Sequence, residues 1–501
     1  MKRASAPNGL FAAALLLLMI TLAIGIRQLW IFSTDDAYIT LRYAENWIRH
    51  GHLTWNVSET PPVEGYSSTL YLLLGALALL GGASPLLVWK LTGIAALAGT
   101  CLLLLRWMAP LTSRCTALLA AMLYAGYAGT VWWAVSGLET PVYVFLLLAA
   151  LVLFDRSREA TAPSHRHRLL GATSLVVFLC GLTRPEGPVV GILLGAFVVA
   201  DGLVRRETAR AVVIQALWLA LPFAVLYSGY FALRYAHFGR LWPNTFYCKV
   251  ANAANPWTII AMFLEAARIP LLIGLCGFLN AGRRRLLALL YGFIILNTAL
   301  YYGVDPIIGH LNRHSMISLA LAYTVCALGL HELLARLRPW AVWSVPLVLG
   351  LLTACGFLFN LPNLTRSATR YTARMEARVQ LAAYLRGIPV TDYAMGDAGL
   401  VPCLTPDVPV YDYYGLNSSE FVSPSINRDM RKYAEWLLSQ RPHAVILISW
   451  NARQWMPQNE RQAELAAVFN EQTGYLDQQI NFGAPGDTFQ YRVLLRASEH
   501  N

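Results

Sequence analysis

The sequence predicts a polytopic α-helical membrane protein that ends in a small soluble α/β domain. Of its 501 residues, 56% are hydrophobic and only 13% are charged, whereas a soluble globular chain carries about a quarter charged residues. Leu-rich apolar runs recur between residues 10 and 359, as in a chain that crosses the ~30 Å hydrocarbon core of a bilayer many times. After residue 360, charges of both signs and short β-like runs appear, which indicates a domain of about 140 residues.

We expect eleven membrane spans, at 10–31, 86–106, 115–133, 141–154, 168–183, 187–204, 211–235, 258–280, 286–302, 315–332 and 340–359. The first run could pass for a cleaved signal peptide. No convincing small-residue cleavage site follows it, so we interpret it as an uncleaved first span. In the domain after residue 360 we expect strands at 408–411, 444–448 and 491–495, and a helix at 371–386.

The basic residues decide the expected topology. The apolar run at 67–80 is near the lower limit for a span, and the basic clusters fall on one side only if this run lies along the interface. Those clusters, at 2–3, 106–114, 156–168, 205–210, 283–285 and 336–338, are then cytoplasmic. We therefore expect a transmembrane domain at 1–359 with a first loop at 32–85, and an extracytoplasmic domain at 360–501. Topology also explains the net charge of +11, so we expect no nucleic-acid binding.

Asp35 and Asp36 follow the first span directly and are the strongest candidates for catalysis. Adjacent carboxylates at a membrane exit are costly and usually have a reason. One of them could cap a helix that has an apolar stripe at Ala37, Leu41 and Ala44. Capping does not account for the pair. A carboxylate here could act as a general base, or could help to hold a divalent cation against phosphate oxygens, and the sequence does not choose between these roles.

Four cations are candidates for binding a phosphate group, and all fall in segments expected on the same face of the membrane: Arg42, Arg184, Lys249 and Arg313. Each has a simpler alternative. Arg184 could instead pair with Glu139 or Glu186 in a structural role, and Lys249 could be a lysine that snorkels to the interface.

A further set of polar residues in the same segments could contact a substrate: Glu64, Tyr66, Glu139, Asn244, His310, His314 and Asp397. Glu64 could equally stabilise a turn, and Asp397 could be a turn aspartate after Gly396. His310 and His314 have a spacing that would suit a metal on a helix. No neighbouring Glu or thiolate completes a site there, so we expect no metal.

Six short motifs resemble, in the same order, those of the GT-C membrane glycosyltransferases, specifically the group with the mycobacterial terminal arabinofuranosyltransferases. They are DDAYI at 35–39, VEGY at 63–66, GLETP at 137–141, LTRPEG at 182–187, WPNT at 242–245 and MGDAGL at 395–400. The resemblance implies a GT-C fold of about eleven spans and an interfacial first loop whose acidic residue, here Asp35 or Asp36, is essential. It also implies a sugar donor linked to polyprenyl phosphate, with D-arabinofuranose as the sugar.

The resemblance further implies a bacterial cytoplasmic (inner) membrane enzyme with its active site on the periplasmic face. It implies no certain cofactor, and a divalent cation stays open as an alternative. The tail after Tyr414 is short compared with the mycobacterial enzymes. That difference leaves the acceptor open between a cell-surface glycan and a protein such as pilin.

Two other classes compete with a transferase. A transporter or flippase of lipid-linked sugars should place ionisable residues in the middle of its spans or break its helices there. The expected spans carry almost none. A scaffold without catalytic activity should tolerate the loss of Asp35 and Asp36.

Overall fold

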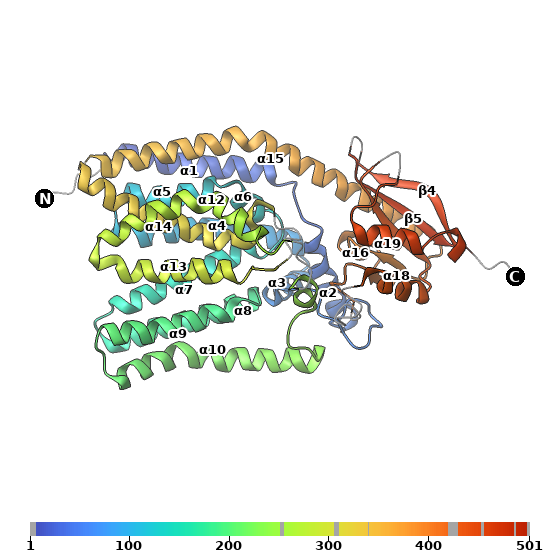
Figure 1. Cartoon of the computed structure of the whole chain (residues 1–501), viewed down its shortest axis with the longest axis horizontal. Helices are drawn as coiled ribbons and strands as arrows, with labels where there is room; N and C mark the ends of the chain where they lie inside the picture. Colours follow the sequence, from blue (N-terminus) through green and yellow to red (C-terminus); the bar gives the residue numbers. More distant parts are fainter. Residues whose placement is uncertain are drawn as a thin grey trace. The chain divides into compact units, whose positions relative to one another are not determined.

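The computed structural model describes residues 7–250, 255–304, 310–338, 340–418, 429–451, 455–484 and 487–497 (Figure 1). Contacts divide the chain into two compact units. We call the first the helical unit; it comprises Met1–Trp30, Lys90–Arg234 and Ala254–Thr365. We call the second the mixed unit; it comprises Ile31–Trp89, Tyr235–Ala253 and Arg366–Asn501.

The helical unit is built from long apolar helices. They are α1 (Asn8–Leu29), α4 (Pro85–Leu111), α5 (Arg114–Gly126), α6 (Ala128–Ala134), α7 (Thr140–Glu159), α8 (Pro163–Thr183), α9 (Gly187–Val204), α10 (Ala209–Phe238), α12 (Thr258–Leu275), α13 (Arg284–Ala299), α14 (Met316–Leu337) and the first part of α15 (Ala341–Gly387). In Figure 1, α7, α8, α9 and α10 follow one another as neighbouring rods. The helix α14 lies deepest, since nearly all of its residues are buried.

Every range expected to span the membrane falls on a helix of this unit. Among the described residues, eight helices are long and apolar enough to cross a bilayer, or nine if α5 and α6, which are bent by 66°, form one span. The two expected spans outside this count are α8 and α13, and α13 is only 16 residues long. The chain is a membrane protein.

The mixed unit combines the first loop with the C-terminal part of the chain. The first loop forms α2 (Asp36–His50) and α3 (Thr69–Leu80), and a second short segment forms α11 (Asn244–Val250). The apolar α3 has 12 residues, too few to cross the ~30 Å hydrocarbon core. Residue 359, where we expect a domain boundary, lies inside the 47-residue helix α15.

A five-stranded mixed sheet forms the core of the C-terminal part, in the order β2-β1-β3-β5-β4. Its strands are β1 (Tyr393–Met395), β2 (Val410–Asp412), β3 (Ala444–Ser449), β4 (Tyr475–Gly483) and β5 (Gln490–Arg496). The strands β2, β1 and β3 run parallel, whereas β5 and β4 are antiparallel to their neighbours. The three strands that the sequence predicts at 408–411, 444–448 and 491–495 are confirmed with small shifts, β1 lies directly before Gly396, where a strand is also plausible from the sequence, and β4 is additional.

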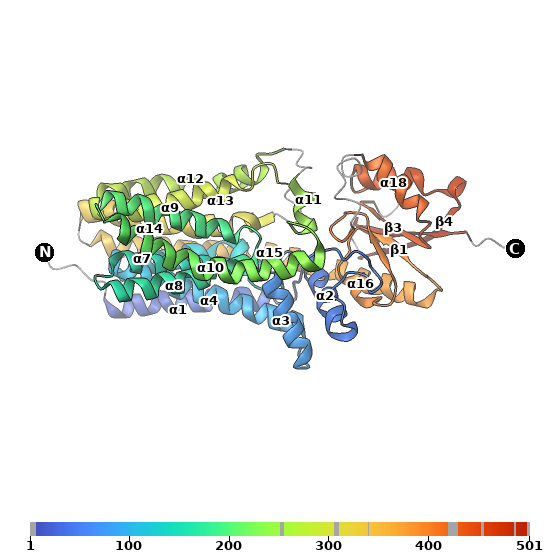
Figure 2. The ribbon, with the colours of Figure 1, turned by 90° about the horizontal axis from the view of Figure 1, so that it is seen from below.

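Helices cover both faces of this sheet. The last turns of α15 pack through Leu381, Ala382 and Leu385 on one face. The helices α18 (Met430–Ser439) and α19 (Glu460–Val468) cover the other face, and Figure 2 shows α18 on one side of the strands. The short helix α16 (Leu400–Leu404) follows β1 and contacts α2.

Candidate active site

Asp35 is held by the turn that follows β1. It precedes α2, and its side chain does not cap that helix. Its Oδ1 atom instead accepts a hydrogen bond of 2.9 Å from the backbone N–H of Leu400. The same oxygen lies 3.2 Å from Nε of Arg378. Since Asp35 is only 8% exposed, its carboxylate needs these partners, and capping is not its role.

Arg378 connects Asp35 to a second carboxylate. It lies on α15, is 5% exposed, and donates through Nη2 to Oδ2 of Asp397 at 2.6 Å. The hydroxyl of Tyr491, on β5, donates to the same oxygen at 2.6 Å. One guanidinium therefore serves two carboxylates, and Asp397 is part of an ionic cluster rather than only a turn residue.

Gly399 provides the space in which Asp35 sits. A Cβ atom at position 399 would lie 2.1 Å from the backbone oxygen of Asp35 and 2.5 Å from its Oδ2 atom. Contacts under 3.0 Å cannot be accommodated without displacement. The motif at 395–400 thus has a physical function: Asp397 anchors the arginine, Gly399 leaves room for Asp35, and Leu400 donates to it.

The environment of Asp35 favours its neutral form more than usual. Burial raises its pKa, the Arg378 guanidinium lowers it, and the negative charge of Asp397 raises it again. The net result is a pKa of about 7 instead of the ordinary 3.8. A carboxylate with a pKa near neutrality is well suited to accept a proton from a hydroxyl group.

The donor set of this cluster does not fit a divalent cation. Such ions take several carboxylate and carbonyl oxygens around one point, but Arg378 already occupies the space between Asp35 and Asp397. No group of three or more His, Cys, Asp or Glu side chains converges as a metal site within the described residues. We therefore derive no step through a metal.

The two other charged residues of the first loop have different environments. Asp36 lies in the first turn of α2 and is more accessible than Asp35. Arg42 is 2% exposed, and its guanidinium donates to the carbonyl groups of Trp55, Pro402, Thr405 and Val408 and to the amide oxygen of Asn56. Because these groups occupy its donors, we propose a structural role for Arg42 in place of phosphate binding.

Asn244 holds a loop that follows β2. Its amide nitrogen donates to the carbonyl oxygens of Gly415 at 2.6 Å and Ser418 at 2.9 Å, and its backbone N–H donates to the carbonyl oxygen of Glu64. Glu64 is buried, as is Tyr66, whose ring packs on Tyr43. These residues shape the first loop. Lys249 lies in α11, and its side chain lies outside the described residues.

In the helical unit, Arg184 binds two carboxylates at once. Its Nη1 atom lies 3.3 Å from Oε1 of Glu139, and its Nη2 atom lies 3.0 Å from Oε1 of Glu186. The hydroxyl of Tyr301 donates to Glu186 at 2.6 Å. Burial raises the pKa of Glu186, but Arg184 and the Tyr301 hydroxyl outweigh burial and hold that pKa below its ordinary value. The structural pairing of Arg184 is therefore present with both glutamates.

Arg313 joins the same group of charges. Its Nη2 atom lies 3.4 Å from Oε1 of Glu139, so two arginines share one glutamate. It belongs to the turn at His310–Ser315, in which Leu311 and Asn312 have φ of 51° and 56°. Positive φ is rare for leucine and is often found at functional sites, whereas asparagine adopts it readily. The ring of His310 lies 4.9 Å from that of Trp133, and the ring of His314 lies 5.2 Å from that of Tyr301, each pair tilted by 44°.

No family model matches the chain, and no curated protein matches it either. Its fold does match solved structures. The crystal structure of ArnT from Cupriavidus metallidurans bound to undecaprenyl phosphate is 10% identical, with a TM-score of 0.59 over 97% of this chain and 98% of that one. The fold is of the GT-C type.

Two other GT-C proteins share this fold. The oligosaccharyltransferase of Archaeoglobus fulgidus is 13% identical with a TM-score of 0.56, over 86% of this chain and 69% of that one. The mycobacterial arabinofuranosyltransferase AftD is 14% identical with a TM-score of 0.51, over 100% of this chain but only 42% of that one. The expectation of a GT-C fold is confirmed.

Sequence reasoning missed three members of the charged clusters in this chain: Arg378, Tyr491 and Tyr301. A weak signal existed for Arg378, because it lies on a helix that the sequence predicts at 371–386, in a domain where Asp397 was already a candidate. Nothing marked the two tyrosines, since each is one of 24 in the chain. Their role depends on a hydroxyl group reaching a carboxylate from a distant segment.

Proposed function

We propose that the chain is a glycosyltransferase that moves a sugar from a polyprenyl-phosphate carrier to a hydroxyl group on the extracytoplasmic face of a bacterial inner membrane. The observation that carries this proposal is the environment of Asp35: a buried carboxylate, seated against Gly399 and Leu400, with a pKa near 7. The GT-C fold supports it, because ArnT with this fold has been crystallised with undecaprenyl phosphate.

In the proposed reaction, Asp35 is the general base. The acceptor oxygen attacks the anomeric carbon of the sugar, and the bond between that carbon and the phosphate oxygen breaks. The proton of the acceptor hydroxyl passes to the Asp35 carboxylate, and polyprenyl phosphate leaves as an anion. Arg378 and Asp397 are positioning residues, since they hold Asp35 and set its pKa without contacting the substrate themselves.

Cationic side chains would stabilise the leaving phosphate, because charge-assisted hydrogen bonds to phosphate oxygens are the strongest that a side chain can form. We assign this role to Arg313, whose Nη2 atom lies 3.4 Å from Oε1 of Glu139, and to Lys249. Arg184 lies closer to its partner, at 3.0 Å from Glu186, so we assign it mainly a structural role in holding Glu139 and Glu186 in place.

The finer identity of the substrates extends the same proposal. We propose D-arabinofuranose as the sugar, because the six motifs between 35–39 and 395–400 resemble, in the same order, those of the arabinofuranosyltransferase group. We propose a cell-surface glycan or a surface protein such as pilin as the acceptor. Incubation of the purified chain with polyprenyl-phosphate-linked arabinofuranose, ribose, mannose and glucose tests the donor. Release of free polyprenyl phosphate from the arabinose donor alone is the expected result, and no release from any donor contradicts a transferase.

A flippase of lipid-linked sugars is the second candidate, and the 66° bend between α5 and α6 favours it, since transporters often use broken helices. The ionisable residues argue against it. Lys90, for example, lies in the first turns of α4, where its Nζ donates to the carbonyl oxygen of Trp30 at 2.7 Å. Proteoliposomes separate the two functions: a flippase moves the intact lipid-linked sugar across the bilayer, whereas a transferase cleaves it.

A further inference from the structure

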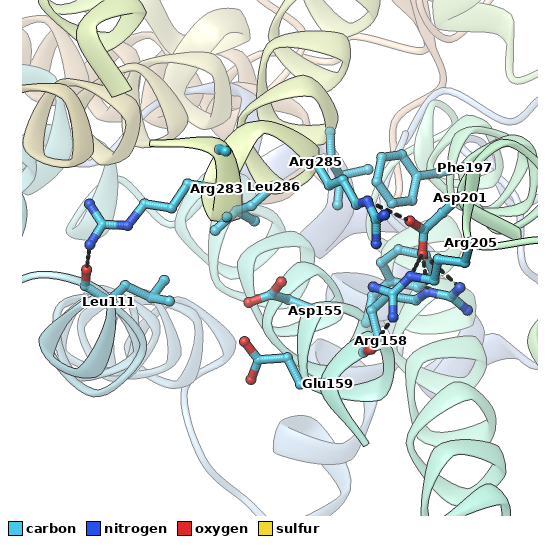
Figure 3. A pocket seen from close by; sticks show the side chains of 14 residues that line it. Leu111, Asp155, Arg158, Glu159, Phe197, Asp201, Arg205, Arg283, Arg285 and Leu286 are labelled. Carbon is cyan, nitrogen blue, oxygen red and sulfur yellow. Dashed lines mark hydrogen bonds and ion pairs between the residues drawn. The ribbon is translucent and has the colours of Figure 1, made fainter. Parts of the chain in front are cut away.

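The helical unit contains a cavity of about 510 Å³ that the proposed reaction does not use (Figure 3). It lies among the ends of α4, α7, α9 and α13. The helix α7 begins directly after Glu139 and ends at Glu159, so the cavity is at the opposite end of that helix, about 30 Å from the Glu139 cluster at 1.5 Å per residue. By our topology this end faces the cytoplasm. Its volume is within the range of small-molecule sites, about 300–1,000 Å³.

One group of charges in the cavity is cationic and has spare donors. Asp201, 3% exposed, accepts from Arg158 at 2.7 Å and Arg205 at 2.8 Å, and lies 3.4 Å from Nε of Arg285. Among the described residues, neither terminal nitrogen of Arg285 has a partner, and Nη2 of Arg205 has none. Arg158 also lies 3.3 Å from Oε1 of Glu207, so three arginines share two carboxylates, which leaves an excess of positive charge that can bind an anion.

A second group in the same cavity is anionic. Asp155 uses one oxygen to accept from the indole N–H of Trp107 at 2.7 Å, and no described residue donates a hydrogen bond to its other oxygen. Glu159 has no partner in the described parts of the chain. Figure 3 shows both carboxylates set apart from the arginines around Asp201, and no ion pair between described residues links the two groups.

Apolar residues form one wall of the cavity. Leu111, Phe154, Phe197, Leu286 and Leu289 line it together with the charges. A site with separated positive and negative groups beside an apolar wall, at the end of membrane-spanning helices, suits an amphiphile whose head carries both charges. A purely anionic head would meet Asp155 and Glu159 unpaired, and a purely cationic head would meet the arginines.

We propose that this cavity binds a phosphoethanolamine group, with its phosphate at Arg285 and Arg205 and its primary ammonium at Asp155 and Glu159. The apolar wall assigns this group to a phospholipid, phosphatidylethanolamine, rather than to free phosphoethanolamine. A choline head is disfavoured, because its quaternary ammonium has no N–H to donate to the carboxylates. The site is separate from the proposed transferase reaction, and its occupancy can be measured without any sugar donor.

The test is a titration of the purified full-length chain with short-chain phosphatidylethanolamine, phosphatidylcholine and phosphatidylglycerol, followed by native mass spectrometry. We expect the ethanolamine lipid to bind about ten-fold more tightly than the other two. Arg285→Gln should weaken its binding about ten-fold. Glu159→Gln should reduce it to the level of the choline lipid and leave the choline lipid unchanged.

Arg284→Gln is the matched control, because Arg284 is the neighbouring residue, donates to the carbonyl oxygen of Phe278 and does not line the cavity. Its lipid binding should equal that of the parent chain. Melting temperatures confirm folding, and Asp155→Asn replaces Glu159→Gln if that variant unfolds. Equal binding of all three lipids, preference for the glycerol lipid, or variants that match the control would overturn the proposal. Binding of free phosphoethanolamine as tight as that of the lipid would overturn the assignment to a lipid.

Discussion

Two charged clusters contain the same types of residue but shift carboxylate pKa values in opposite directions. The Arg378 cluster of the mixed unit contains Asp35, Asp397 and Tyr491, and the Arg184 cluster of the helical unit contains Glu139, Glu186 and Tyr301. In each, a guanidinium lies between two carboxylates and a tyrosine hydroxyl donates to one of them. In the helical unit a second arginine, Arg313, joins the group, and the pKa of Glu186 is lowered. In the mixed unit Arg378 serves Asp35 and Asp397 alone, and the pKa of Asp35 is raised to about 7.

The difference teaches that charge balance, rather than residue type, decides what a buried cluster can do. In the helical unit, Arg184 and the Tyr301 hydroxyl hold the pKa of Glu186 below its ordinary value, and Arg313 adds a second cation to the group. One arginine for two aspartates, in a buried place, leaves a carboxylate that can take up a proton near neutral pH. We therefore expect the first cluster to act in binding and the second in proton transfer.

Asp35→Asn should have the largest effect, and it tests whether the cluster around Asp35 acts in proton transfer. An amide cannot accept the proton of the acceptor hydroxyl, so turnover should fall by about 10²- to 10⁴-fold while donor binding persists. The measurement is release of polyprenyl phosphate under single-turnover conditions. Asp36→Asn is the paired variant, with an expected loss of about ten-fold or less, since the structure gives Asp35 the anchored position. A full loss in Asp36→Asn with an active Asp35→Asn would move the base to Asp36.

Gly399→Ala tests whether turnover depends on the space that Gly399 leaves for Asp35. Its Cβ would lie 2.5 Å from the Asp35 carboxylate oxygen, so the carboxylate must move. A displacement of about 1 Å can cost about 10²-fold in turnover, and overpacking should lower the free energy of unfolding by about 1–3 kcal/mol. Gly387→Ala is the matched control, because a Cβ at that position meets open space. Wild-type turnover in Gly399→Ala would show that catalysis does not depend on the position of Asp35 against Gly399.

Arg313→Gln tests the cationic cluster. If Arg313 turns to the donor phosphate, its loss should raise KM for the donor about ten-fold and change kcat little, since a hydrogen bond to a charged group contributes about 1.5–3 kcal/mol. Steady-state kinetics with a varied donor concentration measure this. Arg184→Gln should instead lower stability by about 3–5 kcal/mol, because it removes a buried cation that pairs with both Glu139 and Glu186. An unchanged KM in Arg313→Gln would remove Arg313 from the binding site.

The smallest expected effect is a shift in the pH profile. A general base must be deprotonated, so turnover should rise with pH through about 7, the pKa of Asp35, and fall below it. The charge of Asp397 raises that pKa, so Asp397→Asn should move the acid limb to lower pH by about one unit. Arg378→Gln should move it to higher pH, because the guanidinium lowers the pKa. Profiles of kcat between pH 5 and 9 measure both, and shifts of the same sign would contradict the assignment.

Composition and the length of the apolar runs were sufficient to predict the fold class and most of the membrane-spanning helices. Composition and apolar run length act locally, because a helix in hydrocarbon must satisfy its own backbone hydrogen bonds. The same local patterns located β3 and β5 and the helix that ends α15. They failed for β4, whose polar sequence YLDQQINFG has no alternation of apolar and polar residues to announce a strand.

The candidate residues were determined in part. Asp35, Asp397, Glu139, Arg184 and Arg313 are prominent in the sequence because charges beside apolar runs are rare. The sequence offered Glu139 and Glu186 as partners of Arg184, but it offered none for Arg42 or Asp35. In the folded chain Arg42 donates to four backbone carbonyl groups, and Arg378 binds Asp35 and Asp397. The physical reason is distance along the chain. A pKa depends on burial and on charges within a few ångströms, and residue 35 meets residues 378 and 400 only after the chain has folded.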